Sequence, residues 1–206
     1  MGKKRIERFC CILTASFLLL GCSKIVTNYY PDKEDPGLAI FSDKGNNLLS
    51  CFINGKPWRT INRVQYGAGS VNYECSIYKQ VSTAIMDTLI FSWQGYYNDN
   101  EFSQGTISLN LAVPKNFYYR SFSSLRGRRL QIDSTTNGFF STSISTLSIG
   151  NPKGNGNIYF HNANFDSLAP NQYYGHIDGL LEAAFPLFTI TRGRFDEVIT
   201  NDNVHL

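Results

Sequence analysis

Hydrophobic and polar positions alternate along most of the chain after Leu48. The clearest alternation lies in 105–113, where Ile107, Leu109, Leu111 and Val113 would share one face of a strand. Segments of the same kind lie at 71–78, 87–93, 139–149, 157–162, 176–188 and 189–199. Turns rich in glycine, proline and asparagine separate them. Short strands at this spacing predict an all-β domain with little helix, a single antiparallel β-sandwich, with a barrel as the alternative.

The first predicted hairpin opens the domain. Its strands read LLSCFI and KPWRTI, and Asn54 and Gly55 lie between them. An Asn-Gly pair favours a type I′ turn, because both central residues of that turn need a positive φ. Trp58 is expected to fill one end of the core.

The last predicted strand, 189–199, carries three informative residues. Gly193 permits a turn or a bulge in the strand. Phe195 is expected to point into the core. Asp196 is expected to cap a neighbouring turn, because aspartate side chains accept hydrogen bonds from nearby backbone N–H groups.

The first 21 residues differ in character from the rest. Four basic residues precede Phe9, and the run from Phe9 to Leu20 carries no charge. This layout is typical of a secretory signal peptide, and the run is shorter than the roughly 20 apolar residues of a membrane-spanning helix. Its end, LLLGC, resembles the bacterial lipobox. That resemblance implies cleavage before Cys22 and acylation of Cys22; an uncleaved anchor and an ordinary signal peptide are the alternatives.

Removing 1–21 changes the charge of the chain. The segment takes four of the 19 basic and one of the 16 acidic residues, which leaves 15 of each. A neutral chain without a basic stripe does not favour binding to nucleic acid. The only basic cluster, RGRR at 126–129, is expected to be a solvated edge.

The same cleavage and acylation leave two cysteines, Cys51 and Cys75. In an oxidising compartment such a pair predicts a disulfide, which would close a ring worth about 3 kcal/mol of stability. The alternative is two buried free thiols in adjacent strands.

Three regions follow from these patterns. Residues 1–21 are the expected signal peptide, 22–46 the lipidated cysteine with a flexible tether, and 47–206 the β-domain. Pro31, Pro36 and Gly37, with mixed charge around them, favour a tether that lets the domain stand off the bilayer. The expected location is the cell envelope, on the outer membrane, and either membrane face is open.

Candidate catalytic chemistry is sparse. His161, His176 and His205 lack the ligand spacing of a zinc site, although carboxylates lie near the first two. No GxSxG, HExxH or P-loop motif occurs. We therefore expect no metal, no cofactor and a non-enzymatic protein, with an envelope hydrolase acting on glycan or peptide as the alternative.

Tyrosine pairs are the main candidates for recognition. They occur at 29–30, 96–97, 118–119 and 173–174. Neighbours in a strand point to opposite faces, so each pair should expose one ring, and exposed aromatic rings are common contacts for sugars and proteins. Trp93, Tyr96 and Tyr97 form the first candidate ligand-binding cluster. The expected partner is a glycan or an envelope protein, besides the membrane that the lipid would hold.

Two longer motifs carry a family resemblance. FINGKPW at 52–58 and the segment 175–198, which ends in TRGRFDEV, look together with the lipobox like a broad group of uncharacterised Bacteroidota lipoproteins. In that group an NGKPW-like hairpin starts a β-rich domain and an iTnGrFD-like strand ends it. The resemblance implies the fold and the lipid anchor, and it implies no activity.

Overall fold

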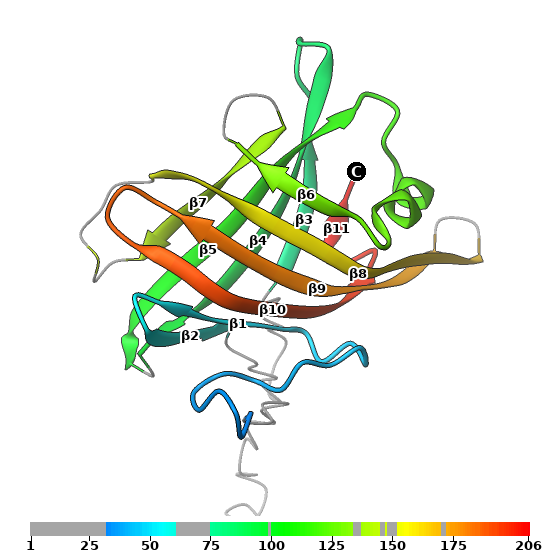
Figure 1. The fold of residues 1–206 in the computed structure, drawn as a ribbon. Coiled ribbons are helices and arrows are strands. Elements are labelled where there is room, and N and C mark those ends of the chain that lie inside the picture. The colour runs from blue at the N-terminus through cyan, green and yellow to red at the C-terminus, as the bar shows by residue number, and fades with distance from the viewer. Residues whose placement is uncertain are drawn as a thin grey trace, which may run out of the picture. The chain divides into compact units, whose positions relative to one another are not determined.

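Strands dominate the protein (Figure 1). In a computed structural model, residues 32–60, 75–98, 100–133, 137–144, 147, 152–169 and 172–206 are described, without the side chains of 100–102, 167–169 and 172. Strand accounts for 65% of the structure and helix for 6%, which confirms the predicted all-β class with little helix.

Eleven strands and one short 3₁₀ helix, η1, lie in the described part of the chain. They are β1 (Leu48–Ile53), β2 (Lys56–Thr60), β3 (Cys75–Gln80), β4 (Met86–Tyr97), β5 (Asn100–Pro114), η1 (Tyr119–Leu125), β6 (Arg129–Ile132), β7 (Gly138–Ile144), β8 (Lys153–Ala169), β9 (Gln172–Ala184), β10 (Thr189–Thr200) and β11 (Val204–His205).

One sheet closes on itself. Eight strands form an antiparallel barrel in the order β4-β2-β1-β10-β9-β8-β7-β5, and β5 returns to pair with β4. The sheet thus forms the barrel that was the alternative to the expected sandwich. β2 and β3 both pair with the same edge of β4. β6 and β7 both pair with the same edge of β8. The short β11 pairs with β3 in parallel.

Aromatic side chains fill the barrel. Ile107, Leu109, Leu111 and Val113, which were predicted to share one face of β5, are all buried, as expected. Phe91 and Trp93 stack with ring centroids 6.0 Å apart, and Phe160 lies 5.9 Å from Phe91 and 5.8 Å from Phe195. Burying one such side chain contributes about 2–3 kcal/mol, so the inward-facing aromatic residues stabilise the closed sheet.

Four local predictions are confirmed. Asn54 and Gly55 both have positive φ, 49° and 76°, in the turn between β1 and β2. The pairing of β9 and β10 shifts between Ile190 and Gly193, which is the bulge expected at Gly193. Beyond the bulge Phe195 is buried, and Trp58 is fully buried on β2.

The predicted disulfide is wrong. Cys51 on β1 and Cys75 on β3 are free, buried thiols. Cys75 pairs with Trp93 on β4, whereas Cys51 pairs with Trp58, which pairs with Tyr97 on the same edge of β4. The two cysteines therefore lie four residues apart along β4, roughly 13 Å at about 3.3 Å per residue. A disulfide needs Cα atoms within about 7 Å. The cysteines are also not in adjacent strands, as the alternative supposed.

Residues 32–46, expected to belong to a flexible tether, lie against the barrel instead. Leu38 and Ala39 are buried, and the Ala39 N–H donates to Ser50 Oγ on β1 at 3.1 Å. In Figure 1 this segment, drawn in blue, runs beside β1. The packed part of the chain therefore begins well before residue 47.

The predictions for 1–21, for Cys22 and for Tyr29–Tyr30 lie outside the described residues. Within the described part, no helix has the length and apolar character needed to cross a membrane.

Candidate functional site on the outer face of β8, β9 and β10

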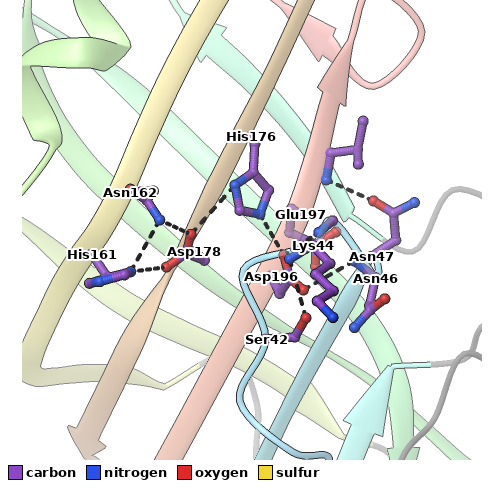
Figure 2. A network of polar contacts seen from close by, with 12 residues as sticks. Ser42, Lys44, Asn46, Asn47, His161, Asn162, His176, Asp178, Asp196 and Glu197 are labelled. Carbon is purple, nitrogen blue, oxygen red and sulfur yellow. Dashed lines mark hydrogen bonds and ion pairs between the residues drawn. The ribbon is translucent and has the colours of Figure 1, made fainter.

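Strand alternation assembles a polar surface on the outer face of three neighbouring strands. On β9 the inward residues are Gly175, Ile177, Gly179 and Leu181, so His176, Asp178 and Leu180 point outward. Strand pairing aligns Asp178 with Asn162 on β8 and Asp196 on β10. This row begins the polar network of Figure 2.

Asp178 lies at the centre of the network. Its carboxylate is fully buried; His161 Nδ1 lies 2.8 Å from Oδ1, and Asn162 Nδ2 donates to Oδ2 at 2.7 Å. His176 Nδ1 lies 3.5 Å from Oδ2. Because a carboxylate only accepts hydrogen bonds, His161 bonds Asp178 through Nδ1 only in the forms that carry a hydrogen on Nδ1; Asn162 Nδ2 lies 3.1 Å from the same nitrogen.

Asp196 joins the network to the N-terminal segment. His176 Nε2 lies 2.6 Å from its Oδ1, and the N–H groups of Gly45 and Asn46 donate to its two oxygens at 2.8 and 3.1 Å. Asp196 thus accepts backbone N–H groups, as predicted, from a segment about 150 residues earlier in the chain. Asn47 adds a further contact, because its Oδ1 accepts from the Val198 N–H at 2.8 Å. We call 42–47 with these contacts the clasp.

The clasp favours a charged imidazole at His176. Burial opposes the charge, but the hydrogen bond to Asp196 and the charges of Asp196, Asp178 and Asp43 outweigh it and raise the pKa of His176. For Asp196, burial works against ionisation, yet hydrogen bonds from His176, Asn46, Gly45 and Ser42 lower its pKa. A cation between two anions therefore holds the segment on the barrel.

A second set of ion pairs holds 32–39. Arg194 on β10 donates to Asp32, to Asp35 and to the carbonyl oxygen of Ala39, the last at 3.2 Å. Arg192 also donates to Asp35. The hydrogen bond from Arg194 is the main reason that the pKa of Asp32 is lowered.

Beside these ion pairs a groove of about 500 Å³ opens on the same face. Four of its residues form one row across four strands, because Arg129 on β6 pairs with Tyr159, Tyr159 with Leu180, and Leu180 with Arg194. Asn157, Glu182 and Arg192 line it further along the strands. The groove therefore combines an apolar floor with polar side chains on either side.

The floor of the groove consists of Tyr159 and Leu180. Leu180 is 44% exposed. The Arg129 guanidinium lies 6.0 Å from the centroid of the Tyr159 ring. Arg129 itself is exposed, and no carboxylate of the described residues forms an ion pair with it.

The predicted aromatic cluster is not a recognition surface as a whole. Trp93 is fully buried in the barrel, where its Nε1 donates to Glu197 Oε1 at 3.1 Å. Tyr96 and Tyr97 are half-buried, and Tyr97 packs against the core. The structure therefore does not bring the three residues together on an exposed face.

The other described tyrosine pairs do meet. Tyr119 and Tyr173 stack with centroids 3.9 Å apart, and the Tyr119 hydroxyl donates to the Val204 carbonyl at 3.1 Å. Their neighbours Tyr118 and Tyr174 are exposed. For Tyr173 and Tyr174 on β9 this follows from strand alternation, whereas Tyr118 and Tyr119 lie at the start of η1. The stacked pair closes an end of the core.

The sequence contained partial signals for the network but none for the groove. His176 and Asp178, two residues apart, must share a strand face. Tyr159, Leu180 and Arg129 come from three separate segments, and only the strand register aligns them. No group of three or more histidine, cysteine, aspartate or glutamate side chains in the described part could hold a metal ion.

Comparison of the chain with known protein families, with curated proteins and with solved structures finds no match. The resemblance to Bacteroidota lipoproteins stays a prediction.

Proposed function

We propose that the protein is a lipid-anchored component of the cell envelope whose barrel binds a glycan in the groove beside β10. The basic-then-apolar N-terminal segment and the LLLGC motif support the anchor at Cys22. The row of Arg129, Tyr159, Leu180 and Arg194 is the observation that carries the binding function.

The chemistry of the row suits a sugar. Tyr159 and Leu180 offer an apolar surface for the C–H face of a pyranose ring. Arg129, Asn157 and Glu182 stand around it with planar groups that can bond neighbouring hydroxyls. A volume near 500 Å³ matches a small-molecule site, whereas a stable protein interface needs about 800 Å² from each partner.

An acidic glycan fits best. Asp35 in the groove is already bound by Arg192 and Arg194. Arg129 has no carboxylate partner in the described part of the chain, and a guanidinium can bind a carboxylate through two parallel hydrogen bonds. A uronic acid would supply that carboxylate.

A hydrolase has less support. The two carboxylates that line the groove are Asp35 and Glu182, and Asp35 accepts from two arginines, which opposes its use as a proton donor. His161 is oriented like a general base, yet no hydroxyl or thiol of the described residues is hydrogen-bonded to it.

A glycan array probed with the full chain carrying Cys22→Ala tests the proposal. We expect saturable binding to uronic-acid-containing oligosaccharides and weaker binding to neutral ones. Binding to none of the glycans, or release of shortened sugars during the incubation, would contradict it, the second in favour of a hydrolase.

The anchor needs a separate test. Growth with a labelled fatty acid should label the wild-type chain in the membrane fraction, and Cys22→Ala should abolish the label. A Cys22→Ala chain that still carries the label would contradict the proposed lipid anchor at Cys22. It would not bear on the proposed glycan site.

A further inference from the structure

A second cavity lies on the other side of β6 from the groove. Its volume is about 510 Å³, and its walls come from β5, η1 and β6. The apolar lining consists of Leu111, Val113, Phe117, Leu125 and Leu130. Four of these five belong to the buried core, and Leu130 is half-buried and packs against it.

Strand pairing explains why the wall opens here. β5 pairs with β7 only as far as Leu111, which lies opposite Gly138, and β6 pairs with β8. No described ladder joins β5 to β6. η1 lies in the connection between β5 and β6 (Figure 1), and its residues Ser121, Ser124 and Leu125 line the cavity. Its side chains Phe122 and Leu125 are buried.

Charge at the rim is positive. Arg128 lines the cavity, whereas Arg129, the next residue, lines the groove on the opposite side. Arg126, Arg128 and Arg129 are exposed, and none forms an ion pair with a carboxylate of the described residues. The basic cluster of the sequence thus supplies one arginine to each site.

We propose that this cavity binds a single-chain anionic amphiphile, with its tail among Leu111, Val113, Phe117 and Leu125 and its head group at Arg128. An apolar chamber with one convergent cation is complementary to such a molecule and not to a sugar. The Ser121 hydroxyl and the side-chain amide of Asn116 also line the cavity and can donate hydrogen bonds to the same head group, whereas the Ser124 hydroxyl donates to the Ser121 carbonyl oxygen.

Calorimetric titration of the full chain carrying Cys22→Ala with decanoate tests the proposal, with 1-decanol as the neutral probe. We expect one saturable decanoate site per chain. Arg128→Ala should weaken decanoate about tenfold and leave decanol within twofold, because only the acid has a charge for the arginine. Arg126→Ala, an exposed arginine that does not line the cavity, is the matched control.

Filling the cavity provides a second variant. Ser124 on η1 lines it and Ser123 does not, although both are exposed. Ser124→Trp should abolish binding of both probes, and Ser123→Trp should bind like the parent. A lack of saturable decanoate binding would overturn the proposal. It would also be overturned if Ser124→Trp and Ser123→Trp bound the probes equally well, or if Arg128→Ala lost as much affinity for decanol as for decanoate. Tyr159→Ala should leave decanoate binding unchanged, which separates this site from the groove.

Discussion

Gly179 shows how closely single residues are fitted in the wall that carries the site. It lies on β9 between Asp178 of the network and Leu180 of the groove. A Cβ atom there would lie 1.9 Å from the Tyr159 carbonyl oxygen and 2.7 Å from the Phe195 ring. Only glycine allows the strands to approach this closely.

Gly179→Ala should therefore lower the free energy of unfolding by about 3 kcal/mol or more, since the clash is with backbone and with a buried ring. Urea unfolding followed by tryptophan fluorescence measures it. Gly127→Ala is the control: no atom lies within 4 Å, and φ is +70°, so it should cost about 1 kcal/mol. Equal losses in the two variants would contradict the packing described here.

Cys51 and Cys75 are predicted to stay reduced and unreactive in the folded protein. Burial raises the pKa of the Cys51 thiol, which leaves very little thiolate to react. Alkylation without reductant should modify neither cysteine in the native chain and both in denaturant, as read by mass spectrometry. A disulfide-linked peptide containing both residues would show that the strand arrangement is wrong.

Residue-level predictions from sequence succeeded where a residue's chemistry decides its role. Gly193 marks a bulge, Phe195 enters the core and Asp196 accepts backbone N–H groups. They failed for Trp93 and for the cysteines. Alternation says which residues share a face, but neither which face is enclosed nor which strands become neighbours.

At the scale of elements, the clasp makes attachment of the N-terminal segment pH-dependent. The pKa of His176 is raised above 6.5. The stabilisation of the attached segment by charged His176 is therefore complete below pH 6.5 and is lost as the pH rises through the higher pKa of the folded state. The pKa of Asp196 is lowered below 3.8, so its contribution is complete above that pH and is lost as pH falls through the lower folded-state value.

Hydrogen-exchange protection of the Gly45 and Asn46 amides should thus be greatest between about pH 4 and 6.5. Expressed as protection factors, which remove the intrinsic pH dependence of exchange, it should decline on both sides of this window. The Ala39 amide, which donates to the Ser50 hydroxyl, is the control and should not follow the same profile. Protection at Gly45 that keeps rising above neutral pH would contradict the role of His176.

The segment 32–46 was misjudged from sequence for an identifiable reason. Its prolines, glycines and mixed charges are typical of a linker. Its partners, Arg194 and Asp196, lie about 150 residues later in the chain. Local composition contains no information about such contacts.

At the scale of the whole molecule, sequence predicted strands but not closure. A sandwich and a barrel use the same alternation of inward and outward residues. Closure depends on β4, which pairs with β5 on one edge and with β2 and β3 on the other. The groove depends in addition on the register of β6, β8, β9 and β10, which bulges in β8 and β10 shift locally.

The affinity of Tyr159→Ala for an acidic oligosaccharide selected on the array tests the central claim most directly. Circular dichroism confirms the fold of each variant. Tyr78→Ala is the control, because Tyr78 is an exposed tyrosine on β3, far from the groove in strand order. We predict that Tyr159→Ala weakens binding at least tenfold, about 1.4 kcal/mol, and that Tyr78→Ala changes it less than twofold. Equal affinities of Tyr159→Ala and the parent chain would contradict the groove as the glycan site.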